Sequence, residues 1–212
     1  MLLAKQNNLD VALQMALDAL NRADLSPCCE NAGASYEPAS RAIKLKYLDR
    51  LCVIQLPEGR FCWGPKPGAP PLAERILILH YLNRASGTPL SGKLVSFGEV
   101  PGGREYLPAF RRRSVDMLLG AFAHRPEALL DTAALFGGIQ AGYGDISATI
   151  YALPQVPLTF VLWRGDDELH TSGNILFDST VSEYLPTEDI AVLAGVVSAR
   201  LRKGLADPAN VL

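Results

Sequence analysis

The chain has 212 residues, of which 20 are Lys or Arg, 22 are Asp or Glu and 49% are hydrophobic. A chain of this length and composition can bury a full apolar core, so it is neither disordered nor dependent on disulfides or a metal for folding. The formal net charge of -2 argues against broad electrostatic attraction to nucleic acid or to an anionic membrane, and we expect neither as a partner.

The amino-terminal residues show no basic region followed by an apolar stretch. Every apolar run is shorter than the roughly 20 residues of a membrane-spanning helix. We therefore expect a cytoplasmic protein. In that compartment the four cysteines, at positions 28, 29, 52 and 62, are expected to be free thiols, with a metal site or a redox pair as the alternatives.

The first third of the chain is predicted to contain a helix, a loop and a hairpin. Apolar residues recur at helical spacing over 11–23, which predicts an amphipathic helix. Residues 25–41 are rich in Pro, Gly, Ser and Asn, and this composition favours a loop. The runs 44–56 and 60–63 are typical of strands, and the Pro-Glu-Gly sequence between them predicts a hairpin turn.

A connector with four prolines at 65–71 divides the chain. Residues 1–64 are expected to form an N-terminal helix and β-hairpin region that packs on the main domain, and residues 72–206 to form an α+β core. The core is predicted to begin with a central buried helix over 72–86, because this run is apolar on nearly every side and a glycine and a proline follow it.

The remaining elements follow from the same patterns. In chain order they are a strand at 93–100, helices at 104–124 and 127–135, strands at 146–153, 156–163 and 174–177, and a helix from Thr187 to Gly204. Strands and helices do not alternate regularly. The predicted fold class is therefore α+β, with a mixed or antiparallel sheet packed around the central helix and with a C-terminal helix.

Two glycine-rich segments resemble phosphate-binding loops but lack the required context. Residues 87–93 match G-x-x-x-x-G-K, yet Leu94 stands where the loop needs a hydroxyl, and a helix precedes the segment instead of following it. A helix-to-strand turn is predicted there. The Gly142-Tyr143-Gly144 segment precedes a strand instead of a helix, so it too is predicted to be a turn.

Charged residues are segregated in the second half of the chain. Residues 165–189 contain seven Asp or Glu and no Lys or Arg, whereas five arginines lie between 104 and 125. On one interpretation these charges are solvated turn tips and helix ends. On the other, the acidic oxygens bind a hard divalent cation, or an arginine binds a carboxylate or phosphate.

Signatures of nucleophilic catalysis and of zinc binding do not occur, so catalytic residues and cofactors remain unassigned. Three histidines offer acid/base chemistry. His80 lies inside the apolar helix, where a partly buried imidazole with one hydrogen-bond partner is expected. His124 closes a helix, and His170 stands among acidic residues.

Several short sequence segments, referred to below as phrases, together resemble one family. They are Ile76 to Leu82, Gly87 to Lys93, Pro101 to Tyr106, Pro154 to Leu158, Trp163 to Glu168, Leu176 to Asp178 and Leu185 to Asp189. Over about residues 72–201 the chain resembles DUF3786, a bacterial and archaeal domain of unknown function. Some relatives look like fusions to an iron–sulfur segment, which implies a link to anaerobic redox or corrinoid metabolism. This chain lacks the closely spaced cysteines that such a segment needs.

The family phrases suggest a ligand site. If their polar and aromatic residues converge, they would line an amphipathic pocket with aromatic walls and a few polar anchors. The predicted ligand-binding residues are His80, Tyr81, Arg104, Tyr106, Trp163, Asp166, Asp167 and Glu168.

The leading hypothesis is a non-catalytic binding or accessory domain for a small anionic molecule. The alternative is an enzyme that uses the acidic segment 166–178 and a histidine. It would be either metal-dependent, with Asp166, Asp167, Glu168 and His170 as ligands, or an acid/base enzyme with His80 paired to a carboxylate. A third hypothesis is an interaction module in which the arginine-rich helix binds the acidic segment of a second copy, giving a homo-oligomer.

Overall fold

The structure is a computed structural model that describes residues 2–65, 67–166 and 168–208, with the backbone alone for residues 2–7. The contacts divide the chain into two compact units. The first unit comprises residues 1–89, 153–155 and 183–185, and the second comprises 90–152, 156–182 and 186–212. The division falls after Pro89, whereas the sequence suggested the proline-rich connector, because the helix that follows the connector packs within the first unit.

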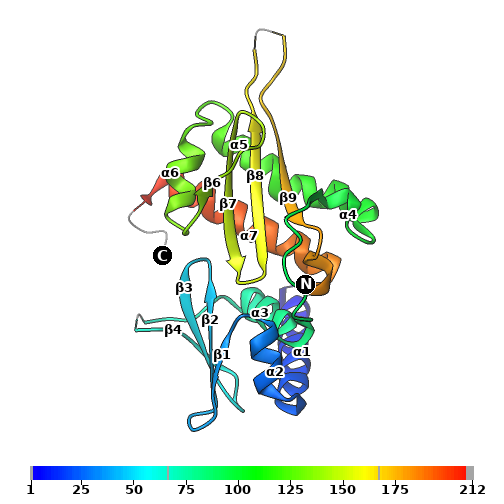
Figure 1. The fold of residues 1–212 in the computed structure, drawn as a ribbon, viewed down its shortest axis with the longest axis vertical. Helices are drawn as coiled ribbons and strands as arrows, with labels where there is room; N and C mark the ends of the chain where they lie inside the picture. The colour runs from blue at the N-terminus through cyan, green and yellow to red at the C-terminus, as the bar shows by residue number, and fades with distance from the viewer. Residues whose placement is uncertain (1, 66, 167, 209–212) are drawn as a thin grey trace. The chain divides into compact units, whose positions relative to one another are not determined.

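The first unit contains a four-stranded antiparallel sheet in the order β1-β2-β3-β4 (Figure 1). Its strands are β1 (Ser35–Glu37), β2 (Ala42–Tyr47), β3 (Arg50–Gln55) and β4 (Arg60–Trp63). The predicted single strand over 44–56 is wrong, because Leu48 and Asp49 both have positive φ and form a two-residue turn between β2 and β3. Neither residue is the asparagine or glycine that normally signals such a turn in a sequence.

Three helices complete the first unit. They are α1 (Leu2–Arg22), α2 (Leu25–Asn31) and α3 (Leu72–Arg84). Helix α2 lies where a loop was predicted. Asp24 caps it by accepting a hydrogen bond from the Ser26 N–H, and Pro27 is tolerated because it stands in the first turn.

Helix α3 is buried, as predicted, but it packs within the first unit instead of beginning the core predicted over 72–206. The apolar residues Ile76 to Leu79 and Leu82 are buried, and α1 packs along the helix. The Asn83 side chain donates to the Ala16 carbonyl of α1 at 2.8 Å, which fixes the pairing of the two helices.

The second unit contains a five-stranded sheet in the order β5-β9-β8-β7-β6. Its strands are β5 (Leu94–Ser96), β6 (Ile139–Gln140), β7 (Ile146–Leu153), β8 (Val156–Trp163) and β9 (Ser172–Asp178). With two sheets, helices and antiparallel pairing, the α+β class is confirmed. Strand β6 was not predicted, since two residues are too short for a periodic pattern.

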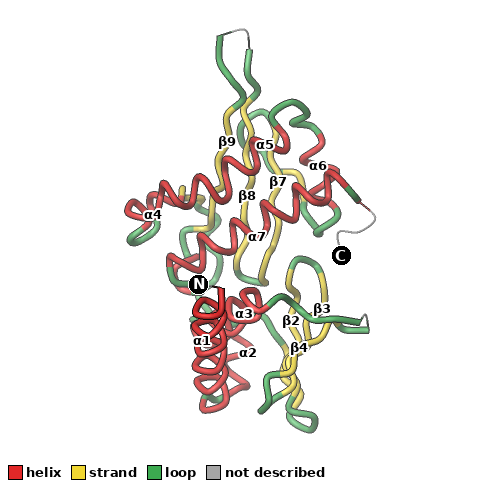
Figure 2. Tube along the Cα trace, turned by 180° about the vertical axis from the view of Figure 1, so that it is seen from behind, coloured by secondary structure: helices red, strands yellow, loops and turns green. Residues whose placement is uncertain are grey.

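Helices cover one face of this second sheet (Figures 1 and 2). They are α4 (Gly103–Phe110), a π-helical turn (Arg111–Val115), α5 (Asp116–Phe122), α6 (Ala128–Ala134) and α7 (Thr187–Ala206). Single 3-10 turns lie at Phe97–Glu99 and Val181–Glu183. Beneath α4 the rings of Phe97 and Phe110 stack at 4.1 Å, and Phe177 of β9 packs against both. These aromatic contacts join the helical layer to the sheet.

Asp178 fastens the turn before β5 to the end of β9. Its carboxylate is nearly inaccessible and accepts hydrogen bonds from the backbone N–H groups of Ser91 at 3.1 Å, Gly92 at 2.8 Å and Thr180 at 3.0 Å. The hydroxyls of Ser91 and Thr180 also donate to it. The segment that resembles a phosphate loop is thus a turn that binds a carboxylate of its own chain.

No helix in the described parts of the chain combines the length and the apolar character that crossing a bilayer requires. The four cysteines are free, and two of them, Cys29 and Cys52, are buried.

Candidate functional site

The continuous helical segment from α4 to α5 runs parallel to α7 in a constant register. Tyr106 of α4 donates a hydrogen bond to the Glu188 carboxylate of α7, and these residues are 82 positions apart. Gly195 of α7 lies against Arg113, which is again 82 positions earlier in the sequence. A Cβ at Gly195 would stand 3.3 Å from the Arg113 carbonyl oxygen. The glycine therefore permits close approach of the two backbones at this end of the contact.

Between these two contacts lies a groove of about 250 Å³. We call it the α4–α7 groove. It is lined by Tyr106, Ala109, Phe110, Arg113, Glu188, Ala191 and Val192. Phe110 is buried at the bottom, while Tyr106 and Val192 are 42% and 36% exposed. A volume below that of drug-sized ligand pockets, with apolar walls and few polar groups, suits a small molecule.

The π-helical turn helps to shape this groove. The Asp116 N–H donates to the Arg111 carbonyl five residues earlier, and the buried Ser114 hydroxyl donates to the Phe110 carbonyl at 2.6 Å. A π turn widens the helix and shifts the angular positions of the residues that follow. Arg111, Arg112 and Arg113 are all exposed, but of these three Arg113 is the one that lines the groove.

The two ends of the groove differ in charge. At one end the Glu188 carboxylate accepts the Tyr106 hydroxyl, and this hydrogen bond, together with the negative charges of Glu188 and Glu105, raises the pKa of Tyr106. The phenol therefore stays protonated over a wider pH range. At the other end stands the Arg113 guanidinium. Along its length, the groove therefore presents the hydrogen-bonded pair of Tyr106 and Glu188, then apolar side chains, and then the cationic Arg113.

Arg104, a predicted ligand residue, lines a separate hollow of about 410 Å³ at the amino end of α4. The other lining residues are Gly98, Glu99, Val100, Gly102, Gly103 and Glu105. The Glu99 carboxylate accepts hydrogen bonds from the Ser96 N–H and hydroxyl, which lower the pKa of this glutamate. Two acidic side chains against one arginine give this hollow no preference for an anion.

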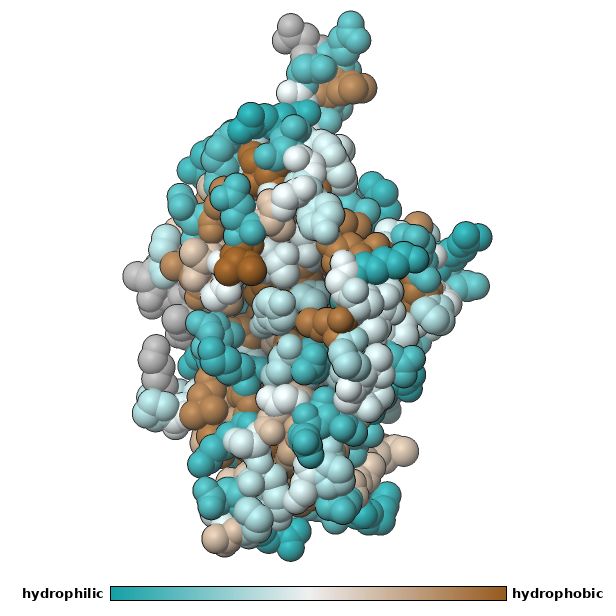
Figure 3. Space-filling view, in the orientation of Figure 1, coloured by the Kyte–Doolittle hydropathy of each residue, from teal (hydrophilic) through white to brown (hydrophobic). Residues whose placement is uncertain are grey.

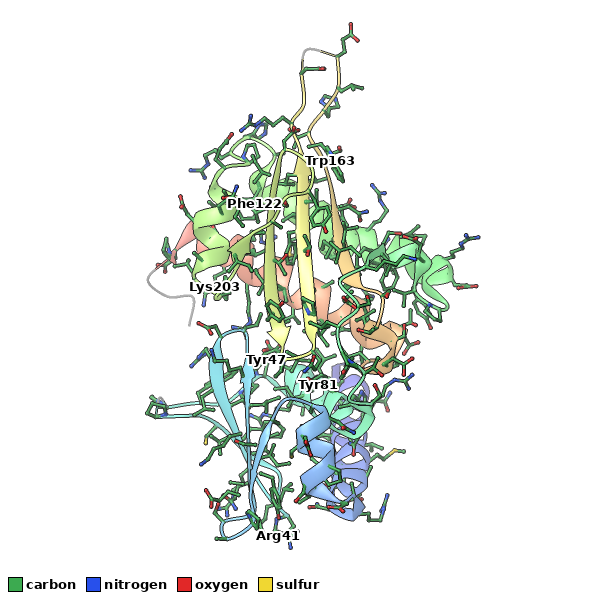
Figure 4. All side chains as sticks on the ribbon, viewed as in Figure 1. Arg41, Tyr47, Tyr81, Phe122, Trp163 and Lys203 are labelled. Atoms are coloured by element: carbon green, nitrogen blue, oxygen red, sulfur yellow. The ribbon has the colours of Figure 1, made fainter. Side chains whose placement is uncertain are left out.

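The acidic turn that was predicted to join the site uses its carboxylate locally. Asp166 accepts hydrogen bonds from the backbone N–H groups of Glu168 at 2.9 Å and Leu169 at 2.8 Å. Asp167 lies outside the described residues. Trp163 stands 42% exposed at the end of β8, at the base of the loop that carries the turn (Figure 4).

This loop projects beyond the end of the second sheet, away from α4, in both views of the backbone (Figures 1 and 2). Its surface is largely hydrophilic (Figure 3), with Leu169 as an exposed hydrophobic residue. Within the second unit the structure thus places Arg104 and Tyr106 on α4, and Trp163, Asp166 and Glu168 at a distant end of the sheet.

His80 and Tyr81 belong to α3 of the first unit. His80 is half-buried. The buried Tyr81 hydroxyl donates to the Ala32 carbonyl at 2.6 Å and accepts the Gln155 N–H at 3.2 Å, and its ring stacks on Tyr184. Burial raises the pKa of Tyr81 far above its usual value. These contacts give Tyr81 a structural role, and ligand binding by the predicted set stays a prediction.

The metal-dependent alternative also depends on the acidic turn. Across residues 2–65, 67–166 and 168–208, no group of three or more His, Cys, Asp or Glu side chains is arranged to hold a metal ion. The carboxylate of Asp166 is directed to backbone N–H groups of its own turn.

Two groove residues, Arg113 and Glu188, were missing from the predicted site. Both had been noticed only as parts of charge runs, because the register that brings α4 and α7 together cannot be read from either segment alone. The available signal was the helical spacing of seven between Tyr106 and Arg113, which places the two side chains on one helix face.

A family model described as "Domain of unknown function (DUF3786)" matches residues 24–200. The match begins before the proline-rich connector, so it includes α2, the first sheet and α3, which the phrases quoted above covered only in part. No curated protein and no solved structure matches the chain.

Proposed function

Since the chain belongs to the DUF3786 family, whose description assigns no activity, we propose from its geometry that it is a non-catalytic domain that binds a small molecule with an anionic group. The observation that carries the proposal is the α4–α7 groove, where a guanidinium, a phenol and an apolar floor line one hollow. An accessory role in anaerobic redox or corrinoid metabolism, which the resemblance implies, remains a prediction.

Arg113 supplies the recognition of the anion. A guanidinium is always charged and presents its N–H donors in a planar fork that matches a carboxylate or phosphate. Arg113 is exposed, so its charge is available to a ligand that enters from solvent. The apolar residues Ala109, Ala191 and Val192 would cover the ligand body, and burial of apolar surface contributes about 25 cal/mol per Å².

Calorimetric and thermal titrations with inorganic phosphate and with straight-chain carboxylates from acetate to hexanoate test this function. A probe present at a concentration of about ten times its Kd adds about 1.4 kcal/mol to the free energy of unfolding. For a domain of this size, this raises the Tm by roughly 3–6 °C. The Arg113→Gln variant should lose this shift, since the neutral amide removes the charge that attracts the anion.

Arg112→Gln is the matched control. Arg112 is the neighbouring exposed residue of the same π turn and does not line the groove, so this variant should keep the full shift. Equal binding by the Arg113→Gln protein, or no binding of any probe by the unmodified protein, would contradict the proposed function.

A further inference from the structure

Building on the proposed function, we infer that the ligand of the α4–α7 groove carries a protonated amine as well as its anionic group, with an apolar spacer between them. An amino acid with its two charged groups at opposite ends of a short methylene chain has this form. The inference rests on the opposite charges at the two ends of the groove, Glu188 at one end and Arg113 at the other.

The two ends lie a suitable distance apart. The groove runs from Tyr106, which pairs with Glu188, to Arg113, seven residues further along its helical segment, and on α7 it is lined from Glu188 to Val192. At a rise of about 1.5 Å per residue, this corresponds to about 10 Å along the helix axes. The Arg113 and Glu188 side chains both line the groove, so a ligand that meets both need not be longer than this spacing.

Glu188 keeps binding capacity for a cation although Tyr106 already donates to it. The hydrogen bond from the Tyr106 hydroxyl reaches one carboxylate oxygen, Oε1. An ionised carboxylate has two oxygens and about four lone-pair positions, so it can accept an ammonium group at the same time. Glu188 also stands in the first turn of α7, where the helix dipole favours a negative charge.

The middle of the groove matches a methylene spacer. Ala109, Phe110, Ala191 and Val192 present only apolar side chains between the charged ends. A spacer that covers Val192 removes apolar surface from water on both molecules, whereas a polar spacer would lose its hydration without a partner there.

Isothermal titration of the full-length protein with aminohexanoate, hexanoate and hexylamine tests the inference. In the unmodified protein we expect aminohexanoate to bind about tenfold more tightly than hexanoate, as one added charge-assisted hydrogen bond predicts. The Glu188→Gln variant retains an acceptor for Tyr106 but not the charge, so the two probes should bind it equally. Arg113→Gln should weaken both by about tenfold or more.

Glu105→Gln is the matched control for Glu188→Gln, because Glu105 is an exposed acid on α4 that lines the other hollow. This variant should keep the tenfold preference. Equal affinity for hexanoate and aminohexanoate in the unmodified protein, with both lost in Arg113→Gln, would overturn the inference and leave the proposed function in place. Binding of none of the three probes would overturn the inference, and the proposed function would fall with it if inorganic phosphate and the shorter carboxylates also failed to bind.

Discussion

Two charged regions of the second unit use their side chains in opposite ways. At the end of β9, the Asp178 carboxylate accepts five hydrogen bonds from Ser91, Gly92 and Thr180. In the α4–α7 groove, Arg113 and Glu188 are exposed at the edges of a hollow. A charged side chain whose hydrogen bonds are satisfied within the fold stabilises that fold, whereas one that borders a hollow is available to a ligand.

The same contrast applies to the residues that the sequence singled out. Asp166 and Tyr81 are engaged with backbone groups, like Asp178. Of the predicted residues that the structure describes, Tyr106 is the one that lines the groove. Substitutions at the residues bonded to backbone groups should therefore change global or local stability, whereas substitutions at residues that line the groove should change ligand binding.

The largest stability loss is expected for Asp178→Asn. The new amide keeps one oxygen but places an NH2 group against the Gly92 N–H, so a buried donor loses its partner and the charge that strengthened the other bonds disappears. We expect about 3 kcal/mol lower free energy of unfolding in urea titrations followed by circular dichroism. A cost near zero would show that Asp178 does not fasten the turn.

The pH dependence of stability provides an independent check on Asp178. Burial raises the pKa of this carboxyl, but the hydrogen bonds from Thr180 and Ser91 outweigh burial and lower it overall. The stabilisation is therefore present above the unfolded pKa of about 3.9 and is lost as the pH falls through the lower folded value. The difference in stability between the unmodified protein and Asp178→Asn should shrink in that acidic window and stay constant near neutrality.

A smaller loss is expected for Tyr81→Phe. Removal of the buried hydroxyl leaves the Ala32 carbonyl and the Gln155 N–H without their shared partner, which costs about 2 kcal/mol. The control is Tyr106→Phe, which removes a hydroxyl at an exposed position and should leave the urea midpoint unchanged. Tyr81→Phe with unchanged stability but altered aminohexanoate binding would place Tyr81 in the ligand site.

The smallest effect is expected for Asp166→Ala. This exposed carboxylate fixes only the turn that contains it, so the global unfolding midpoint should not move. Local opening should increase, and hydrogen exchange at the Glu168 and Leu169 amides should accelerate. A lower global midpoint would mean that the projecting loop contributes to the cooperative core.

The elements that could be predicted are those with a sustained period. The buried run of α3, the long strands β7 and β8 and the capped helix α7 were all expected close to their observed bounds. The elements that were missed are short. Helix α2 has seven residues and β6 has two, so neither contains enough repeats to distinguish it from a loop.

The site was harder to predict than the fold. Tyr106 was proposed from a family phrase, but its partners Arg113 and Glu188 depend on a helix pairing between residues 82 positions apart. The π turn adds a local rotation that regular helical spacing does not indicate. Local patterns identify which residues are charged, and only the tertiary register decides which of them border the same hollow.

The matched register of α4 and α7 has a consequence for how the chain can vary. One residue inserted between Tyr106 and Arg113 would turn the arginine by about 100° around its helix and remove it from the groove. The same insertion in the projecting loop at 164–171 would lengthen a surface excursion and leave the groove intact. If DUF3786 proteins share this site, length changes should collect in that loop and avoid the seven residues from Tyr106 to Arg113, so gap positions in related sequences would test the proposed binding function.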